Sequence, residues 1–173
     1  EQMLTVSART GTIWSFYYNM RHNINTIVFS IENSSKIMSL IAENGYPGDG
    51  GAYTYTEEET MYALYMSQAL AMRGYCYGNL ARWYTPVMKS SYMTGYTIDT
   101  YKCVPLYTES NMNSPQALST SAEVYNRVFS DLSTSIMLFE KFGAYYEEVQ
   151  GSKYNRDTKL IININVARGL IAY

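Results

Sequence analysis

The sequence predicts an all-α fold with long irregular loops. Three segments carry apolar side chains at alternating spacings of three and four residues, which is the pattern of an amphipathic helix. Helix start signals precede two of these segments, and no segment shows the sustained strict alternation of a half-buried strand. We therefore expect four helices, close to residues 13–43, 58–84, 121–142 and 163–173.

The first predicted helix begins after Thr12, whose hydroxyl suits an N-cap. We expect its buried stripe to continue through Met38 and Ile41 to a stop at Asn44-Gly45, with a break at the polar Asn33-Ser34-Ser35 as the alternative. The stripe consists of Ile13, Tyr17, Met20, Ile24, Ile27 and Ile31.

The second predicted helix runs from about Glu57 to Tyr84 and has two distinct sides. Because an interior glycine costs about 1 kcal/mol relative to alanine, a row of small residues indicates close approach of a neighbouring helix. That row is Ser67, Ala71, Gly74, Gly78 and Ala81. The apolar stripe opposite consists of Tyr62, Tyr65, Ala69, Met72, Cys76, Leu80 and Trp83.

The third predicted helix opens with Thr120-Ser121-Ala122-Glu123, a capping box in which hydroxyl and carboxylate satisfy backbone donors reciprocally. Gly143 can end it, and a fourth helix begins near Asn163. Residues 102–109 are expected to be extended around Pro105. The stripe of the third helix is Val124, Val128, Leu132, Ile136 and Phe139.

Composition restricts the classes of function. The formal net charge is −2 and charged residues are 16% of the chain, against roughly a quarter in average proteins. This argues against nucleic acid as a partner, because phosphate binding needs a concentrated basic face. Nineteen tyrosines instead suit surfaces that bury flat rings and hydrogen-bond at the rim, in helix packing or in sugar recognition.

Motifs for catalysis or metal binding are not found in the sequence. The single histidine, His22, has no metal-ligand spacing around it and is expected to be structural. Cys76 and Cys103 are expected to be buried free thiols, with a disulfide between them as the alternative. Consecutive acids at residues 57–59 are better explained by the helix dipole than by the two facing carboxylates of a glycosidase. We therefore expect no enzyme activity, no metal and no cofactor.

Loops are the remaining place for a binding site, since the helical stripes belong to the core. The clearest is the glycine-rich stretch 45–55, where Tyr46, Tyr53 and Tyr55 provide stacking faces and Asp49 provides an acceptor for hydroxyl groups. A solvent-facing connector is the alternative for this loop. A second candidate is the insertion 86–102, which includes Tyr96.

Four blocks of the sequence, in this order, resemble those of the SusD/RagB family. Residues 14–25, with Trp14, Tyr18 and Asn25, are similar to its first helix, and residues 69–84 followed by Val104-Pro105-Leu106 resemble its signature helix. The other two blocks are Glu123-Val124-Tyr125 with Asp131-Leu132, and residues 162–172. The resemblance covers most of the chain from Trp14 onward. It departs from the family pattern at Gly74, at Thr85 and in the insertion that follows.

The resemblance implies a tetratricopeptide-like helical scaffold and a cell-surface lipoprotein of the bacterial outer membrane. Such a protein binds oligosaccharide or polysaccharide and delivers it to a SusC-like TonB-dependent porin. Residues 1–173 are then expected to be the N-terminal helical part of a longer chain, truncated at both ends, with the lipid anchor outside it. Sugar contacts ahead of the first family helix would fall on Arg9 and Trp14, although Trp14 also matches a scaffold position. The alternative is a helical-repeat adaptor that binds protein partners.

Overall fold

The computed structural model describes residues 2–33, 57–85, 97, 99–143 and 162–172, with backbone alone for residues 2–9 and 57–59. The described chain is mainly helical, which confirms the predicted all-α class, and it includes one small two-stranded sheet. In order, the elements are α1 (Gln2–Glu32), α3 (Glu57–Tyr84), β1 (Lys102–Pro105), β2 (Leu118–Thr120), α4 (Ser121–Leu138), the π-helical η2 (Phe139–Gly143) and α6 (Ile164–Ala172).

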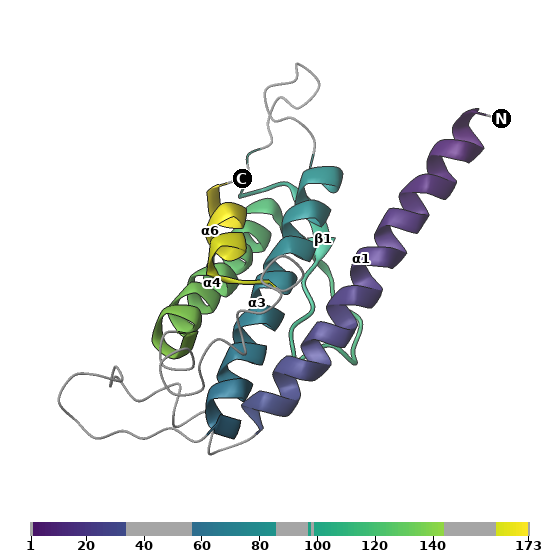
Figure 1. Cartoon of the computed structure of the whole chain (residues 1–173). Helices are drawn as coiled ribbons and strands as arrows, with labels where there is room; N and C mark the ends of the chain where they lie inside the picture. Colours follow the sequence, from purple (N-terminus) through teal and green to yellow (C-terminus); the bar gives the residue numbers. More distant parts are fainter. Residues whose placement is uncertain (1, 34–56, 86–96, 98, 144–161, 173) are drawn as a thin grey trace.

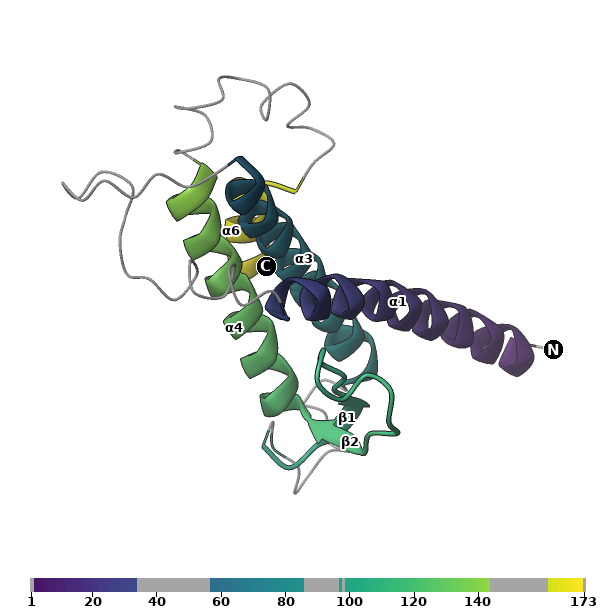
Figure 2. The same ribbon diagram turned by 90° about the horizontal axis from the view of Figure 1, so that it is seen from below.

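Helix α3 is the centre of the arrangement (Figure 1). It packs against α1 on one side and against α4 on the other, and α6 lies against α4 and α3. The N-terminal part of α1 projects away from the other helices (Figure 2). The side chains that α3 shares with both neighbours form the main core, including Leu64, Leu70, Tyr77 and Leu80.

Burial of α3 on two sides makes part of its predicted stripe wrong. Ala69, Cys76 and Leu80 are buried as expected. Tyr62, Tyr65 and Trp83 are 38%, 47% and 63% exposed. A helix between two neighbours buries two faces, so a single stripe does not describe it.

The predicted close approach of a helix to the row of small residues on α3 is found at two of them, Ser67 and Gly74, which contact α4. A Cβ added at Gly74 would lie 2.8 Å from Cγ of Leu132, so only glycine fits there without movement. The Ser135 hydroxyl donates to the Ser67 carbonyl oxygen at 2.7 Å and joins the same two helices. Gly78 differs, because a Cβ there would meet nothing within 4 Å.

Helix α1 begins at Gln2, well before the predicted start, so Thr12 lies inside the helix and is not its N-cap. A tertiary contact supports the earlier turn, since the Tyr84 hydroxyl donates to the Thr10 carbonyl oxygen at 2.9 Å. The predicted stripe is also partly wrong: Ile24 and Ile31 are buried, while Ile27 is 47% exposed.

The start of α4 is confirmed in detail. The Thr120 side chain accepts from the Glu123 backbone N–H, and the Glu123 carboxylate accepts from the Thr120 N–H at 2.7 Å. The predicted α4 stripe is buried or half-buried along its length. Helix α6 begins after Asn163, whose Oδ1 accepts from the backbone of Asn165 and Val166.

The extended segment around Pro105 is confirmed as β1, which pairs antiparallel with β2. This pairing was not predicted. The Tyr18 hydroxyl donates to the Pro105 carbonyl oxygen at 2.9 Å and so joins α1 to β1. Both cysteines are free and buried, as predicted, and burial raises the pKa of Cys76 to about 12.

The two glycines of α3 provide a test of the α3–α4 contact. Gly74→Ala and Gly78→Ala gain the same helix propensity, but only the first forces a Cβ against the buried Leu132. We expect Gly78→Ala to be more stable than Gly74→Ala by about 1–3 kcal/mol in urea unfolding. Equal stabilities would mean that α3 and α4 are not in close contact at Gly74.

Candidate functional site

A buried ion pair joins α3 to α4. The Arg73 guanidinium donates from Nε to Asp131 Oδ2 at 2.7 Å and from Nη2 to Asp131 Oδ1 at 2.9 Å. Both side chains are almost fully buried, at 1% and 3% exposed. Two parallel charge-assisted hydrogen bonds fix the direction of both side chains, and therefore the register of the two helices.

The third nitrogen of Arg73 brings in two further segments. Its Nη1 donates to Glu109 Oε2 at 2.6 Å and to Asn25 Oδ1 at 3.1 Å. The Asn25 amide in turn donates to the Tyr107 carbonyl oxygen at 2.9 Å. The cluster thus links α1, α3, α4 and the segment after β1.

Two more charged groups lie at the edge of the cluster. Arg127 Nε is 3.0 Å from Asp131 Oδ1, but that N–H is not directed at the oxygen, so the contact is an ion pair without a hydrogen bond. Burial raises the pKa of Glu32, and the negative charge of Glu109 adds to the rise. For Glu109 burial acts in the same direction, but a backbone N–H and Arg73 outweigh it and lower its pKa.

This cluster is structural rather than a binding site. Four of the five N–H groups of Arg73 already bind Asp131, Glu109 and Asn25, and its side chain is 1% exposed, so it is not accessible to a ligand. Sequence reasoning placed Asn25 and Asp131 in separate blocks and did not predict that they meet at Arg73. Their contacts join helices that are far apart in sequence, and periodicity carries no information on such contacts.

Trp14 belongs to the aromatic core next to this cluster. Its ring lies 4.5 Å from the Tyr18 ring and 4.9 Å from the Tyr84 ring, the latter edge-on. Trp14 is therefore half-buried in packing, which agrees with the scaffold alternative for this residue. Arg9 lies within α1, so its expected position ahead of the first helix is wrong. The other predicted site residues, Tyr46, Asp49, Tyr53, Tyr55 and Tyr96, lie outside the described residues.

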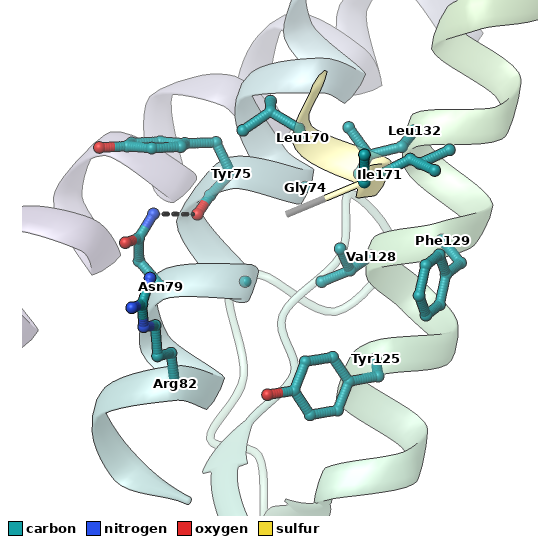
Figure 3. Close-up of a pocket in the computed structure, with 12 residues that line it drawn as sticks. Gly74, Tyr75, Asn79, Arg82, Tyr125, Val128, Phe129, Leu132, Leu170 and Ile171 are labelled. Atoms are coloured by element: carbon teal, nitrogen blue, oxygen red, sulfur yellow. Dashed lines mark hydrogen bonds between the residues drawn. The ribbon is translucent and has the colours of Figure 1, made fainter. Parts of the chain in front are cut away.

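A cavity of about 810 Å³ lies between α3, α4 and α6, and sequence reasoning did not predict it (Figure 3). Its volume is in the range of small-molecule sites. On the α4 side the lining is Tyr125, Val128 and Phe129, and Leu170 and Ile171 of α6 close one end. We call this cavity the α3–α4–α6 groove.

The α3 side of the groove is formed by glycines and polar side chains. Gly78 leaves open space, and Asn79 and Arg82 lie beside it. The Asn79 amide donates to the Tyr75 carbonyl oxygen of its own helix at 2.8 Å, so its Oδ1 remains as an acceptor (Figure 3). The Tyr75 side chain points away from the groove toward Tyr17 of α1. Burial raises the pKa of Tyr17 to about 12, and the hydrogen bond between Tyr17 and Tyr75 adds to the rise.

A second hollow of about 720 Å³ lies between α1 and α3. Its lining is mostly apolar and includes Ile27, Tyr62, Tyr65 and Met72, with Ile162 at one side. Thr26, Ser30 and Gln68 also line it, but less of its surface is polar than in the α3–α4–α6 groove, and the Thr26 and Ser30 hydroxyls donate to carbonyl oxygens of their own helix. The α3–α4–α6 groove is therefore the better candidate for a specific site.

Comparison of the chain with protein-family models, with curated proteins and with solved structures finds no match. Within the described ranges, His, Cys, Asp and Glu side chains form no group suited to hold a metal ion. None of the described helices has the length and hydropathy needed to cross a membrane.

The raised pKa of Glu32 gives a pH-dependent prediction. Between the unfolded pKa of about 4.3 and the higher folded pKa, the folded state binds more protons, so Glu32 lowers stability as pH rises. We expect Glu32→Gln to unfold at higher urea than the wild type at pH 7, with the difference closing toward pH 4. The exposed Glu140→Gln is the control, and equal behaviour of the two variants would contradict the placement of Glu32 beside the cluster.

Proposed function

We propose that this chain is the helical part of a glycan-capture protein of SusD type on the bacterial outer membrane. It binds oligosaccharide without cleaving it and delivers it to a TonB-dependent porin. A lipid anchor outside this chain holds the protein at the membrane. The sequence resemblance motivates the proposal.

One structural observation supports reading the four sequence blocks together as one pattern. Side chains from three of the four blocks contact one another in the buried cluster, where Asn25 and Asp131 both bind Arg73. The fourth block, α6, packs on α4 and α3. Loss of one member leaves a buried partner unsatisfied, so these residues are expected to occur together.

Surface chemistry also supports glycan binding. Exposed aromatic rings on α3 include Tyr75 and Trp83, at 37% and 63% exposed, and the chain as a whole has few charges. Flat rings beside neutral polar groups suit sugar rings, which present both apolar faces and hydroxyl groups. Additional contacts are proposed from the loop residues Tyr46, Asp49, Tyr53 and Tyr55.

The loop part of the proposal predicts a loss of affinity without a loss of stability. Asp49 can accept two hydroxyl hydrogen bonds, and hydrogen bonds to charged groups contribute about 1.5–3 kcal/mol. We expect Asp49→Ala, Tyr53→Ala and Tyr55→Ala each to weaken binding of the oligosaccharide that the full chain selects from a glycan panel. Calorimetric titration measures the affinity, and thermal unfolding checks the fold.

Unchanged affinity in all three variants would mean that residues 45–55 only connect helices and that the sugar binds elsewhere. New reducing ends released from the bound glycan would contradict the non-enzymatic part of the proposal. Thermal unfolding well below that of the wild type would assign these residues to the core.

The second candidate is a helical adaptor for protein partners, and exposed apolar side chains on α1 favour it. Phe16 and Phe29 of α1 are 54% and 47% exposed, and Ile27 lies on the same helix at 47%. Apolar side chains of this kind are more typical of a protein interface than of a sugar site. Binding to a protein partner that Phe29→Ser abolishes, in a chain that binds no glycan, would favour the adaptor.

A further inference from the structure

The Tyr125 hydroxyl differs from those of the core tyrosines. Tyr18, Tyr77 and Tyr84 each donate to a backbone carbonyl oxygen of another segment. Tyr125 makes no such bond with the described residues, although its ring extends from α4 across the α3–α4–α6 groove toward α3 (Figure 3). A half-buried phenol whose hydroxyl makes no hydrogen bond with the described residues provides a stacking face and a hydrogen-bonding group in one place.

The groove has the polarity of a site for an uncharged ligand. Among the described residues that line it none is acidic, and Arg82 is the one that is charged. Apolar side chains of α4 and α6 cover one part of the lining, while Asn79 provides a neutral acceptor across from Tyr125. A ligand with an apolar face and several hydroxyl groups matches both parts.

Gly78 leaves open space in the lining of the groove. No atom lies within 4 Å of a Cβ built there, so the helix would accept a side chain at this position without a clash. Alanine would stabilise a helix interior by about 1 kcal/mol relative to glycine, and at this position its Cβ would not clash with α4. Close packing therefore does not explain Gly78, in contrast to Gly74. Gly78 lines the same groove as Asn79 and Tyr125, the side chains that a ligand would contact.

We propose that the α3–α4–α6 groove binds a neutral sugar ring of the captured glycan, with one face against Tyr125 and hydroxyl groups on Asn79 and the Tyr125 hydroxyl. The inference rests on the proposed function and gives it a site on the described helices, separate from the loop at residues 45–55.

The test uses the full chain and three variants. Gly78→Leu fills the groove, Tyr125→Phe removes the hydroxyl alone, and Gly11→Leu is the matched control, because Gly11 is an equally open interior glycine on α1. Probes are neutral gluco-, manno- and xylo-hexaoses and an acidic galacturonate hexamer, with affinity from calorimetric titration and folding from thermal unfolding.

We expect a neutral hexaose to bind the wild type and Gly11→Leu equally. Affinity should fall at least tenfold in Gly78→Leu and about fivefold in Tyr125→Phe, as for loss of one hydrogen bond, with no drop in melting temperature. Binding that is unchanged in both groove variants would overturn the groove proposal and leave the proposed function standing. Binding of the galacturonate alone would overturn the neutral ligand, and binding of no probe would overturn both proposals.

Discussion

Desolvation of the Arg73 guanidinium is the constraint on which the fold depends. A buried guanidinium is tolerated only if acceptors surround it, and here the acceptors come from three other segments: Asn25 on α1, Glu109 after β1 and Asp131 on α4. Burial alone would lower the pKa of Arg73, but the hydrogen bonds and charges of its two acidic partners raise it. The cation therefore persists, and the helices are held in one register around it.

Local signals in the sequence predicted part of this fold correctly. The capping box at Thr120 and the α4 stripe were right because they depend on backbone donors and on a single buried face. The α3 stripe failed at Trp83 because α3 packs on two sides. The start of α1 was misplaced because the helix continues through Thr12 back to Gln2; the Tyr84 hydroxyl binds this earlier part at the Thr10 carbonyl oxygen, a contact that no local cap signals. Arg21 is buried against the Tyr107 ring, which a stripe of apolar residues also fails to predict.

For the candidate site too, local patterns were predicted and contacts between distant segments were not. Trp14 packs half-buried against Tyr18 and Tyr84, which agrees with the scaffold position of its sequence block, and its sugar contact stays a prediction. The α3–α4–α6 groove was missed because three helices form it, and because Gly78 was assigned with Gly74 to one row of close contact. The two glycines differ only in what lies opposite: Leu132 fills the space at Gly74, and a cavity faces Gly78. That distinction requires the structure.

The most direct test of the central claim is the free energy of unfolding of Arg73→Met. Removing one partner leaves Asp131 buried without its main hydrogen bonds, so we expect a loss of about 3–5 kcal/mol, recovered in large part by Arg73→Met with Asp131→Leu. The matched control is Arg168→Met, which breaks the exposed pair with Glu140 and should cost under about 1 kcal/mol. A loss in Arg73→Met no larger than in this control would contradict the account.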